Sequence, residues 1–267
     1  MRFHGRDSRR RVATRARVSF SLILFIAALL VSPWLQMRAS SQQAVASTAL
    51  GKAPLSEVQV VDSLLAMNLE RAHALHAYQG TRNYMLQYHG FAGTRSAEMV
   101  VDLKYKSPGT KEFTIRSSTG SKLIIGTVFK KLLQAEQDAL GVEAQKRTAL
   151  NRDNYDFTLV GYESTPSGSM YILGVKPRTK GKFLYSGRIW VEAEDFAVTR
   201  VVAQPAKNPS FWTKHSEIDE SYMKVGDFWL PARNHSITRI RFGGSAVLTI
   251  QYKNYEITSA DAVSNLR

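Results

Sequence analysis

The side chains best suited to metal binding are three residues spaced by three along a predicted helix, Glu70, His73 and His76. A Glu-x-x-His pair binds metal in helical bundles only when matching ligands face it, and the pattern is also that of a polar helix face. Three further histidines are scattered over predicted strands: His89, His215 and His235. None has a metal-binding spacing such as H-E-x-x-H. We therefore expect no metal site and no cofactor.

Two groups of carboxylates lie close enough in sequence for acid–base chemistry. They are Glu192, Glu194 and Asp195, and Glu217, Asp219 and Glu220. Paired carboxylates act in this way inside a cleft, whereas the first group lies at a predicted hairpin tip, which water surrounds. A G-x-S-x-G nucleophile elbow is missing, and the absence of cysteine excludes thiol nucleophiles, thiolate metal sites and disulfides. We expect no enzymatic activity; a hydrolase using residues 192–195 is the alternative.

Basic residues are abundant but not concentrated in one stripe. Residues 1–44 contain eight Arg and one Asp, which leaves +7 of the formal charge of +14 for the rest of the chain. Such a spread excess suits weak attraction to anionic lipid surfaces and lacks the basic stripe of a nucleic-acid binder. One small cluster surrounds a predicted turn and either contacts anionic head groups or protects a sheet edge: Lys176, Arg178, Lys180 and Lys182.

The first 46 residues have the features of a secretory signal in the expected order. An arginine-rich start is followed by an apolar run from Val18 to Val31, and Ala44-Val45-Ala46 offers a cleavage site. We predict export to the periplasm, which a cysteine-free chain fits. The alternative is an uncleaved inner-membrane anchor with the domain facing the periplasm, because the apolar stretch continues to Leu35 and could nearly span a bilayer.

After a linker at 47–54, the pattern predicts one helix and then a long series of strands. Ser56 and Gln59 form a capping box, and helical periodicity extends from 56 to 78. Alternation of apolar and polar residues then predicts about nine or ten antiparallel strands, interrupted by a helical insertion within 122–146. So many sequential strands tend to curl. The expected fold is mainly β with helices (α+β), a curled sheet or half-barrel whose concave face the helices cover.

Several segments, in order along the chain, match the pattern of one family. They are Leu103-Lys104-Tyr105-Lys106-Ser107-Pro108, Ser118 to Leu123, Tyr171 to Pro177, and the hairpin made of Gly187 to Val191 and Phe196 to Val201. Together they resemble the LolA-like group of periplasmic lipoprotein-sorting proteins. The resemblance covers 55–257 and leaves 258–267 as a tail.

This resemblance implies an apolar cavity that shields the acyl chains of a lipoprotein or lipid on the way to the outer membrane, with transfer partners at both membranes. It implies a monomer that binds no nucleic acid. The concave strand faces would supply the lining: Leu86, Met99, Val101, Leu103, Phe113, Ile115, Phe157, Leu159, Ile189 and Val191. Without the resemblance, the same residues would form an ordinary sandwich core.

One position departs from the family pattern. Lipoprotein carriers place an Arg just before the Pro of the first segment, where it holds the lid, and here Ser107 takes that position. The lid must therefore close in another way, or the chain serves another lipid. The alternative function is a membrane-tethered envelope sensing or interaction module on the same fold.

Overall fold

The fold is seen in a computed structural model, which describes residues 54–90, 93–165, 168–181, 183–208, 211, 213–241 and 243–259. The expected signal at 1–46, most of the linker at 47–54 and most of the tail at 258–267 lie outside the described residues. Among the helices described, none is both long enough and apolar enough to span a membrane.

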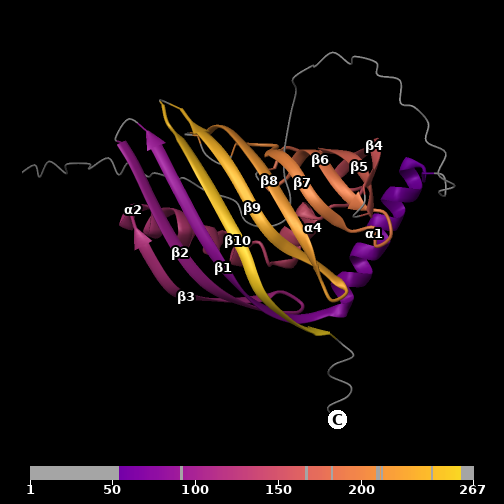
Figure 1. The fold of residues 1–267 in the computed structure, drawn as a ribbon. Coiled ribbons are helices and arrows are strands. Elements are labelled where there is room, and N and C mark those ends of the chain that lie inside the picture. The colour runs from indigo at the N-terminus through magenta and orange to yellow at the C-terminus, as the bar shows by residue number, and fades with distance from the viewer. Residues whose placement is uncertain are drawn as a thin grey trace, which may run out of the picture.

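Ten strands form one antiparallel sheet, as the alternating pattern predicts. They are β1 (Leu75–Gly90), β2 (Gly93–Lys106), β3 (Thr110–Gly120), β4 (Tyr155–Thr165), β5 (Gly168–Pro177), β6 (Tyr185–Glu192), β7 (Val198–Pro205), β8 (Thr213–Val225), β9 (Phe228–Ile240) and β10 (Ser245–Ser259). Their order across the sheet is β3-β2-β1-β10-β9-β8-β7-β6-β5-β4. The sheet is curled and its edges do not meet, so the expected fold class is confirmed (Figure 1).

Helix α1 (Glu57–Ala74) begins at the predicted capping box. The hydroxyl of Ser56 accepts the backbone N–H of Gln59, whose side chain accepts the N–H of Ser56 at 3.0 Å. The helix ends at Ala74 rather than at residue 78, because the next residues join the sheet. Leu75 pairs with Ser259, and the following residues pair with both β2 and β10. Strand pairing on two sides overrides the helical periodicity.

The helical insertion lies between the two edges of the sheet. Strands β3 and β4 are those edges, so the chain must cross the whole sheet between Gly120 and Tyr155. It crosses on the concave side as α2 (Lys122–Ile124), a π-helical stretch η1 (Ile125–Phe129), α3 (Lys130–Asp138) and α4 (Val142–Thr148) (Figure 1). The topology therefore explains why helices cover the concave face.

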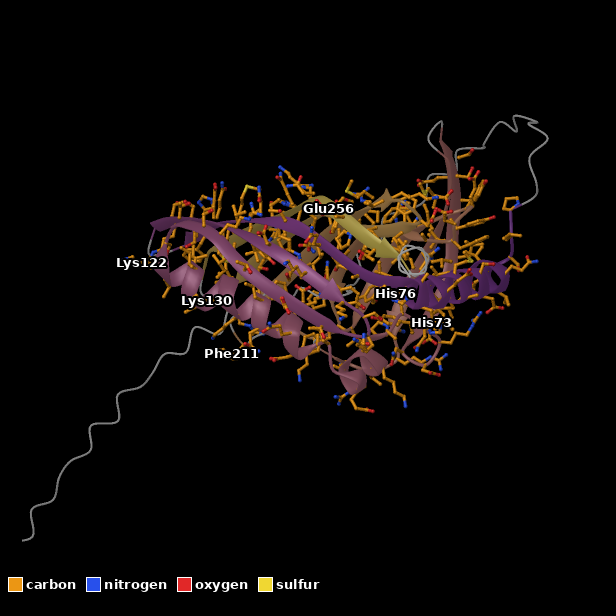
Figure 2. The ribbon with its side chains drawn as sticks, turned by 90° about the horizontal axis from the view of Figure 1, so that it is seen from below. His73, His76, Lys122, Lys130, Phe211 and Glu256 are labelled. Carbon is orange, nitrogen blue, oxygen red and sulfur yellow. The ribbon has the colours of Figure 1, made fainter. Side chains whose placement is uncertain are left out.

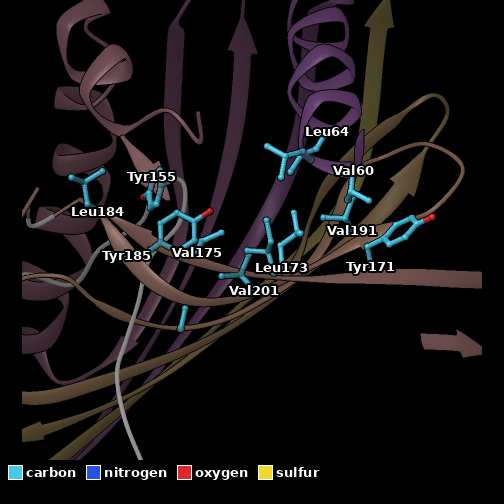
Figure 3. Close-up of a cluster of buried hydrophobic side chains, with 13 residues drawn as sticks. Val60, Leu64, Tyr155, Tyr171, Leu173, Val175, Leu184, Tyr185, Val191 and Val201 are labelled. Carbon is cyan, nitrogen blue, oxygen red and sulfur yellow. The ribbon is translucent and has the colours of Figure 1, made fainter. Parts of the chain in front are cut away.

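The buried apolar side chains form two clusters on this face. The α1 cluster comprises Val60, Val61, Leu64, Tyr155, Tyr171, Leu173, Val175, Leu184, Tyr185, Ile189, Val191, Val201 and Ala203 (Figure 3). The α3 cluster comprises Tyr84, Leu86, Ala97, Met99, Val101, Ile124, Val128, Phe129, Leu132, Leu133, Leu248, Ile250 and Tyr252. The first packs β4 to β7 against α1, and the second packs β1, β2 and β10 against α2, η1 and α3.

Candidate functional site

One row of side chains crosses the concave face from β4 to β2 near its middle. Strand register places its members next to one another in the order Leu159, Leu173, Ile189, Val201, Glu220, Asn234, Ile250, Tyr84 and Met99. The residues at the two ends belong to, or pack against, the α1 and α3 clusters. Glu220 and Asn234 therefore lie where the two apolar clusters meet.

The residues predicted to line a cavity divide between the two clusters. Ile189 and Val191 are buried in the α1 cluster, with Phe157 and Leu159 packed against it. Leu86, Met99 and Val101 are buried in the α3 cluster, and Phe113 packs against it. Leu103 is buried on the same face of β2. Ile115 pairs with Val101 but is 42% exposed on the edge strand β3.

Helices cover most of these lining residues. Val101 and Ile189, for example, are fully buried in the two clusters, each of which includes helical side chains. A hydrocarbon chain can reach this lining only when a helix moves away from the sheet. The contacts that hold the helices in place therefore keep these residues covered.

Glu220 on β8 is the ionisable group at the centre of the row. Register turns it to the concave side, because it pairs with Val201 and Asn234, while Glu217 and Asp219 point to the opposite face. Burial raises the pKa of Glu220 to about 7, although Tyr222, Asn234 and the charge of Arg82 oppose the rise. Its side chain is still only half-buried. Glu220 is thus surrounded by protein atoms but still in contact with water, as expected for a side chain on the inner surface of a curled sheet.

Other polar side chains extend this region along β8 and β9. The hydroxyls of Ser216 and Thr238 hydrogen bond across the two strands at 3.0 Å. Asn234 and Ser236 are also buried on the same face of β9. We call Glu220, Asn234, Ser236, Ser216 and Thr238 the polar strip. It runs along the strands and separates the two apolar clusters.

Two buried tyrosines lie in the α1 cluster near this strip. Tyr155 and Tyr185 are fully buried with ring centroids 4.8 Å apart. Neither hydroxyl has a hydrogen-bond partner among the described residues. Burial raises the pKa of Tyr155, and the nearby backbone of Tyr185 partly offsets this rise. The Tyr155 hydroxyl and this backbone group do not, however, meet the geometry of a hydrogen bond. Burial also raises the pKa of Tyr185, and the charges of Tyr155, Tyr222 and Glu220 add to the rise.

A buried ion triad holds α3 to the sheet. Arg82 of β1 donates to both carboxylate oxygens of Glu136 on α3, at 2.6 and 3.0 Å, and Lys111 of β3 donates at 2.6 Å. Burial alone would raise the pKa of Glu136, but the charges and hydrogen bonds of Arg82 and Lys111 lower it. Removing one partner of such a buried pair leaves an uncompensated charge. The triad therefore favours the covered state of the α3 cluster.

A second polar contact holds the C-terminal end of α1. Arg71 donates to the backbone carbonyls of Asp195 and Phe196 at 2.7 and 3.0 Å. The Asp195 carboxylate accepts hydrogen bonds from Trp229 at 2.8 Å and Lys224 at 2.6 Å. These two hydrogen bonds lower the pKa of Asp195. The contact joins α1 to the β6–β7 and β8–β9 hairpins.

The carboxylates of the first group, at residues 192–195, form contacts within and next to a turn and do not line a cleft. Glu192 accepts the backbone N–H groups of Glu194 and Asp195 at 3.0 and 2.6 Å. In the second group, Asp219 accepts a bidentate pair from Arg200 on the convex face. Among all six carboxylates proposed from the sequence, only Glu220 therefore turns toward the concave side.

The residues considered for metal and anion binding are not brought together by the fold either. Glu70 and His73 lie on α1, whereas His76 belongs to β1, and all three side chains are exposed (Figure 2). No group of three or more possible metal ligands occurs among the described residues. Lys176, Arg178 and Lys180 are exposed, and Arg178 pairs with Asp156 at 3.0 Å.

The remaining candidates bind neighbouring side chains or lie outside the described part. His89, His215 and His235 contact Thr94, Glu217 and Thr249, respectively. Lys182 is not among the described residues.

One groove of about 700 Å³ lies near the start of β1 and the ends of β2 and β10. Its lining includes the charged residues Asp102, Lys104, Arg116 and Glu256. Arg116 forms an ion pair with Asp102. A surface with this many charged groups suits water and ions rather than a hydrocarbon chain.

The ion triad was not among the sites predicted from the sequence, although the alternation of residues in β1 contained a signal for it. Arg82 precedes Tyr84 and Leu86 by two and four positions, so it takes an inward position on the same strand. A charge at an inward position usually has a buried partner. The partner itself, Glu136, could not be identified, because it lies 54 residues away in an insertion.

Solved structures with a similar course of the chain include three from bacterial sources. A DUF1329 family protein from Desulfovibrio piger is 12% identical, with a TM-score of 0.38 over 75% of this chain and 92% of that chain. A putative outer membrane lipoprotein-sorting protein domain from Vibrio parahaemolyticus is 9% identical, with a TM-score of 0.38 over 79% and 99%. A LolA superfamily protein from Nitrosomonas europaea is 9% identical, with a TM-score of 0.34 over 77% and 94%.

No protein-family model matches the chain, and no curated protein matches it significantly. The group expected from the local motifs is nevertheless among the similar structures. Likenesses of this degree carry no inference about cargo or partner. The function of this chain therefore rests on its own concave face.

Proposed function

We propose that the protein is a periplasmic carrier that binds acyl chains of a lipoprotein or lipid on the concave face of its sheet. The observation that carries this proposal is the row across that face, which is apolar on both sides of the polar strip. Each CH₂ group removed from water contributes about 0.8 kcal/mol. A long acyl chain laid along such a row would therefore bind without any covalent chemistry.

The manner in which the helices are held also supports exchange of a ligand. The sheet forms a continuous hydrogen-bonded layer, whereas the helical cover is attached through side chains. The polar attachments include Arg82 and Lys111 to Glu136, and Arg71 to the carbonyls of Asp195 and Phe196. Parting a helix from the sheet breaks few backbone hydrogen bonds, so the sheet can stay folded while its concave face opens.

The proposal is tested by lipid uptake in purified protein. Ile115 is exposed at the edge of the concave face, so Ile115→Asp should fold and should weaken binding of a fluorescent phospholipid about tenfold, the effect of placing a charge beside an acyl chain. Thr114→Asp places the same charge on the opposite face of the same strand and is the matched control.

The expected result is reduced uptake by Ile115→Asp and wild-type uptake by Thr114→Asp. Mass spectrometry of lipid extracted from the wild-type protein should find an acyl-chain species. Equal uptake by the two variants, or a wild-type protein that takes up no lipid, contradicts the proposal. Export is tested separately by sequencing the N-terminus of the mature protein, which we expect to begin at Ser47.

A further inference from the structure

The polar strip interrupts two neighbouring rows of side chains that register defines across the concave face. Glu220 pairs with Val201 of the α1 cluster on one side and with Asn234 on the other, and Asn234 pairs with Ile250 of the α3 cluster. The neighbouring row runs from Ala203 through Ile218 and Ser236 to Leu248. A ligand that contacts both clusters along either row therefore passes over polar side chains of the strip, two in the first row and one in the second. An unbroken hydrocarbon chain laid over Glu220 would remove the water that still reaches its carboxyl group, which is costly.

The region around the strip offers both hydrogen-bond acceptors and donors. Glu220 supplies carboxyl oxygens, with Tyr222 and Asn234 within hydrogen-bonding reach. Tyr185 is fully buried, and within the described part of the chain its hydroxyl has no hydrogen-bond partner. It lies close enough to Glu220 and Tyr222 for both to influence its titration. A buried donor without a partner points to a group that the free protein lacks.

The charges inside the concave face favour an uncharged ligand group. Four ionisable side chains face this region: Arg82, Lys111, Glu136 and Glu220. With Glu220 ionised, the two positive and two negative charges balance. A charged head group placed among them would lack a counter-charge, and burying an unpaired charge is strongly unfavourable. A neutral group that both donates and accepts meets the available partners.

We propose that Glu220, Asn234 and Tyr185 bind an uncharged polar linkage, such as a secondary amide, between two apolar arms of the ligand. One arm lies on the α1 cluster and the other on the α3 cluster. The amide N–H donates to the Glu220 carboxylate, and the amide oxygen accepts from the Tyr185 hydroxyl or the Asn234 amide. This inference rests on the proposed acyl-chain function and specifies the chemical class of its ligand.

The test compares two probes of equal length that differ only in the central group. One is a secondary amide carrying two alkyl arms, and the other is the corresponding dialkyl ether, which accepts a hydrogen bond but donates none. Binding is measured by displacement of a neutral solvatochromic dye from the purified protein. Wild-type protein should bind the amide about tenfold more tightly than the ether, the effect of one satisfied buried donor.

Three variants locate the preference. Glu220→Leu should bind both probes alike, whereas Glu220→Gln should keep most of the preference because its side-chain carbonyl still accepts. Glu217→Leu makes the same replacement on the convex face of β8 and should match the wild type. Tyr185→Phe removes the unpartnered hydroxyl with little change of shape, so it should fold. It should weaken binding of both probes and reduce the preference, because an amide oxygen is a stronger hydrogen-bond acceptor than an ether oxygen. It keeps the test decisive if Glu220→Leu does not fold.

The outcomes separate this inference from the proposed function. A wild-type protein that binds both probes equally overturns the amide site and leaves the carrier function standing. A preference that survives in both Glu220→Leu and Tyr185→Phe also overturns it. Binding of neither probe removes the carrier function and this inference together. A preference lost in the concave-face variants and kept in Glu217→Leu supports the site.

Discussion

Replacing Glu220 by Gln should remove a pH dependence from the stability of the fold. Burial raises the pKa of Glu220 from 4.5 to about 7 in the folded protein. Between these values the folded state keeps a proton that the unfolded state has released, so stability falls as the pH rises through this range. The full shift is worth about 3 kcal/mol at pH 8, and less than about 1 kcal/mol of it is already present at pH 5.

The groups around Glu220 stay the same in the Gln variant, so the difference between the two proteins isolates this one titration. Burial and the charge of Glu136 raise its pKa, while Tyr222, Asn234 and the charge of Arg82 lower it. Tyr185, Tyr252 and Tyr255 also lie close enough to sense its charge. These tyrosines have pKa values above 10, so they remain neutral over the range tested.

Urea unfolding at pH 5 and pH 8 measures the effect. Glu220→Gln should exceed the wild type in stability by about 2–3 kcal/mol at pH 8 and by less than about 1 kcal/mol at pH 5. Glu217→Gln, on the exposed convex face of the same strand, should change little at either pH. If Glu220→Gln and the wild type differ by the same amount at both pH values, Glu220 has an ordinary pKa and does not lie inside a concavity.

Three further predictions concern the attachment of the helices. Glu136→Gln leaves Arg82 buried without a counter-charge and should lower the free energy of unfolding by about 3–5 kcal/mol in urea titrations; a loss below about 1 kcal/mol would show that the triad is hydrated. Arg71→Ala should increase amide hydrogen exchange in α1 while leaving β10 protected, and uniform exchange would argue against a separate attachment. Ser56→Ala should cost about 1 kcal/mol in thermal unfolding, whereas Ser56→Asp should preserve stability.

Much of the sheet could be predicted because alternation is a local property. The row Ala97, Met99, Val101 and Leu103 is apolar at every second position, and all four side chains are buried on one face of β2. The pairing of β1 with β10 could not be predicted in this way. It joins Tyr84 to Ile250, residues at opposite ends of the domain, and nothing in either strand alone specifies that partner.

The candidate site was predictable in its apolar part and not in its polar part. Inward positions indicated the apolar residues of the concave face, but their division into two clusters depends on which helix lies over which strands. Glu220 belonged to a sequence group with Glu217 and Asp219, and only the register of β8 shows that it alone turns inward. Propensity also failed at the end of α1, where Leu75 forms strand pairs on the β10 side instead of continuing the helix.

The position of β10 determines when the fold can be completed. Strands β1 to β3 and strands β4 to β9 each form a continuous series, and no strand pair links the two series until β10 lies between β1 and β9. Because β10 is the last of the described strands, the two series can be joined only when this C-terminal segment is present. The topology therefore depends on contacts between distant parts of the chain, which predicts slow folding. Such a delay would help a chain that crosses the inner membrane unfolded, because the complete sheet cannot form before β10 has been synthesised.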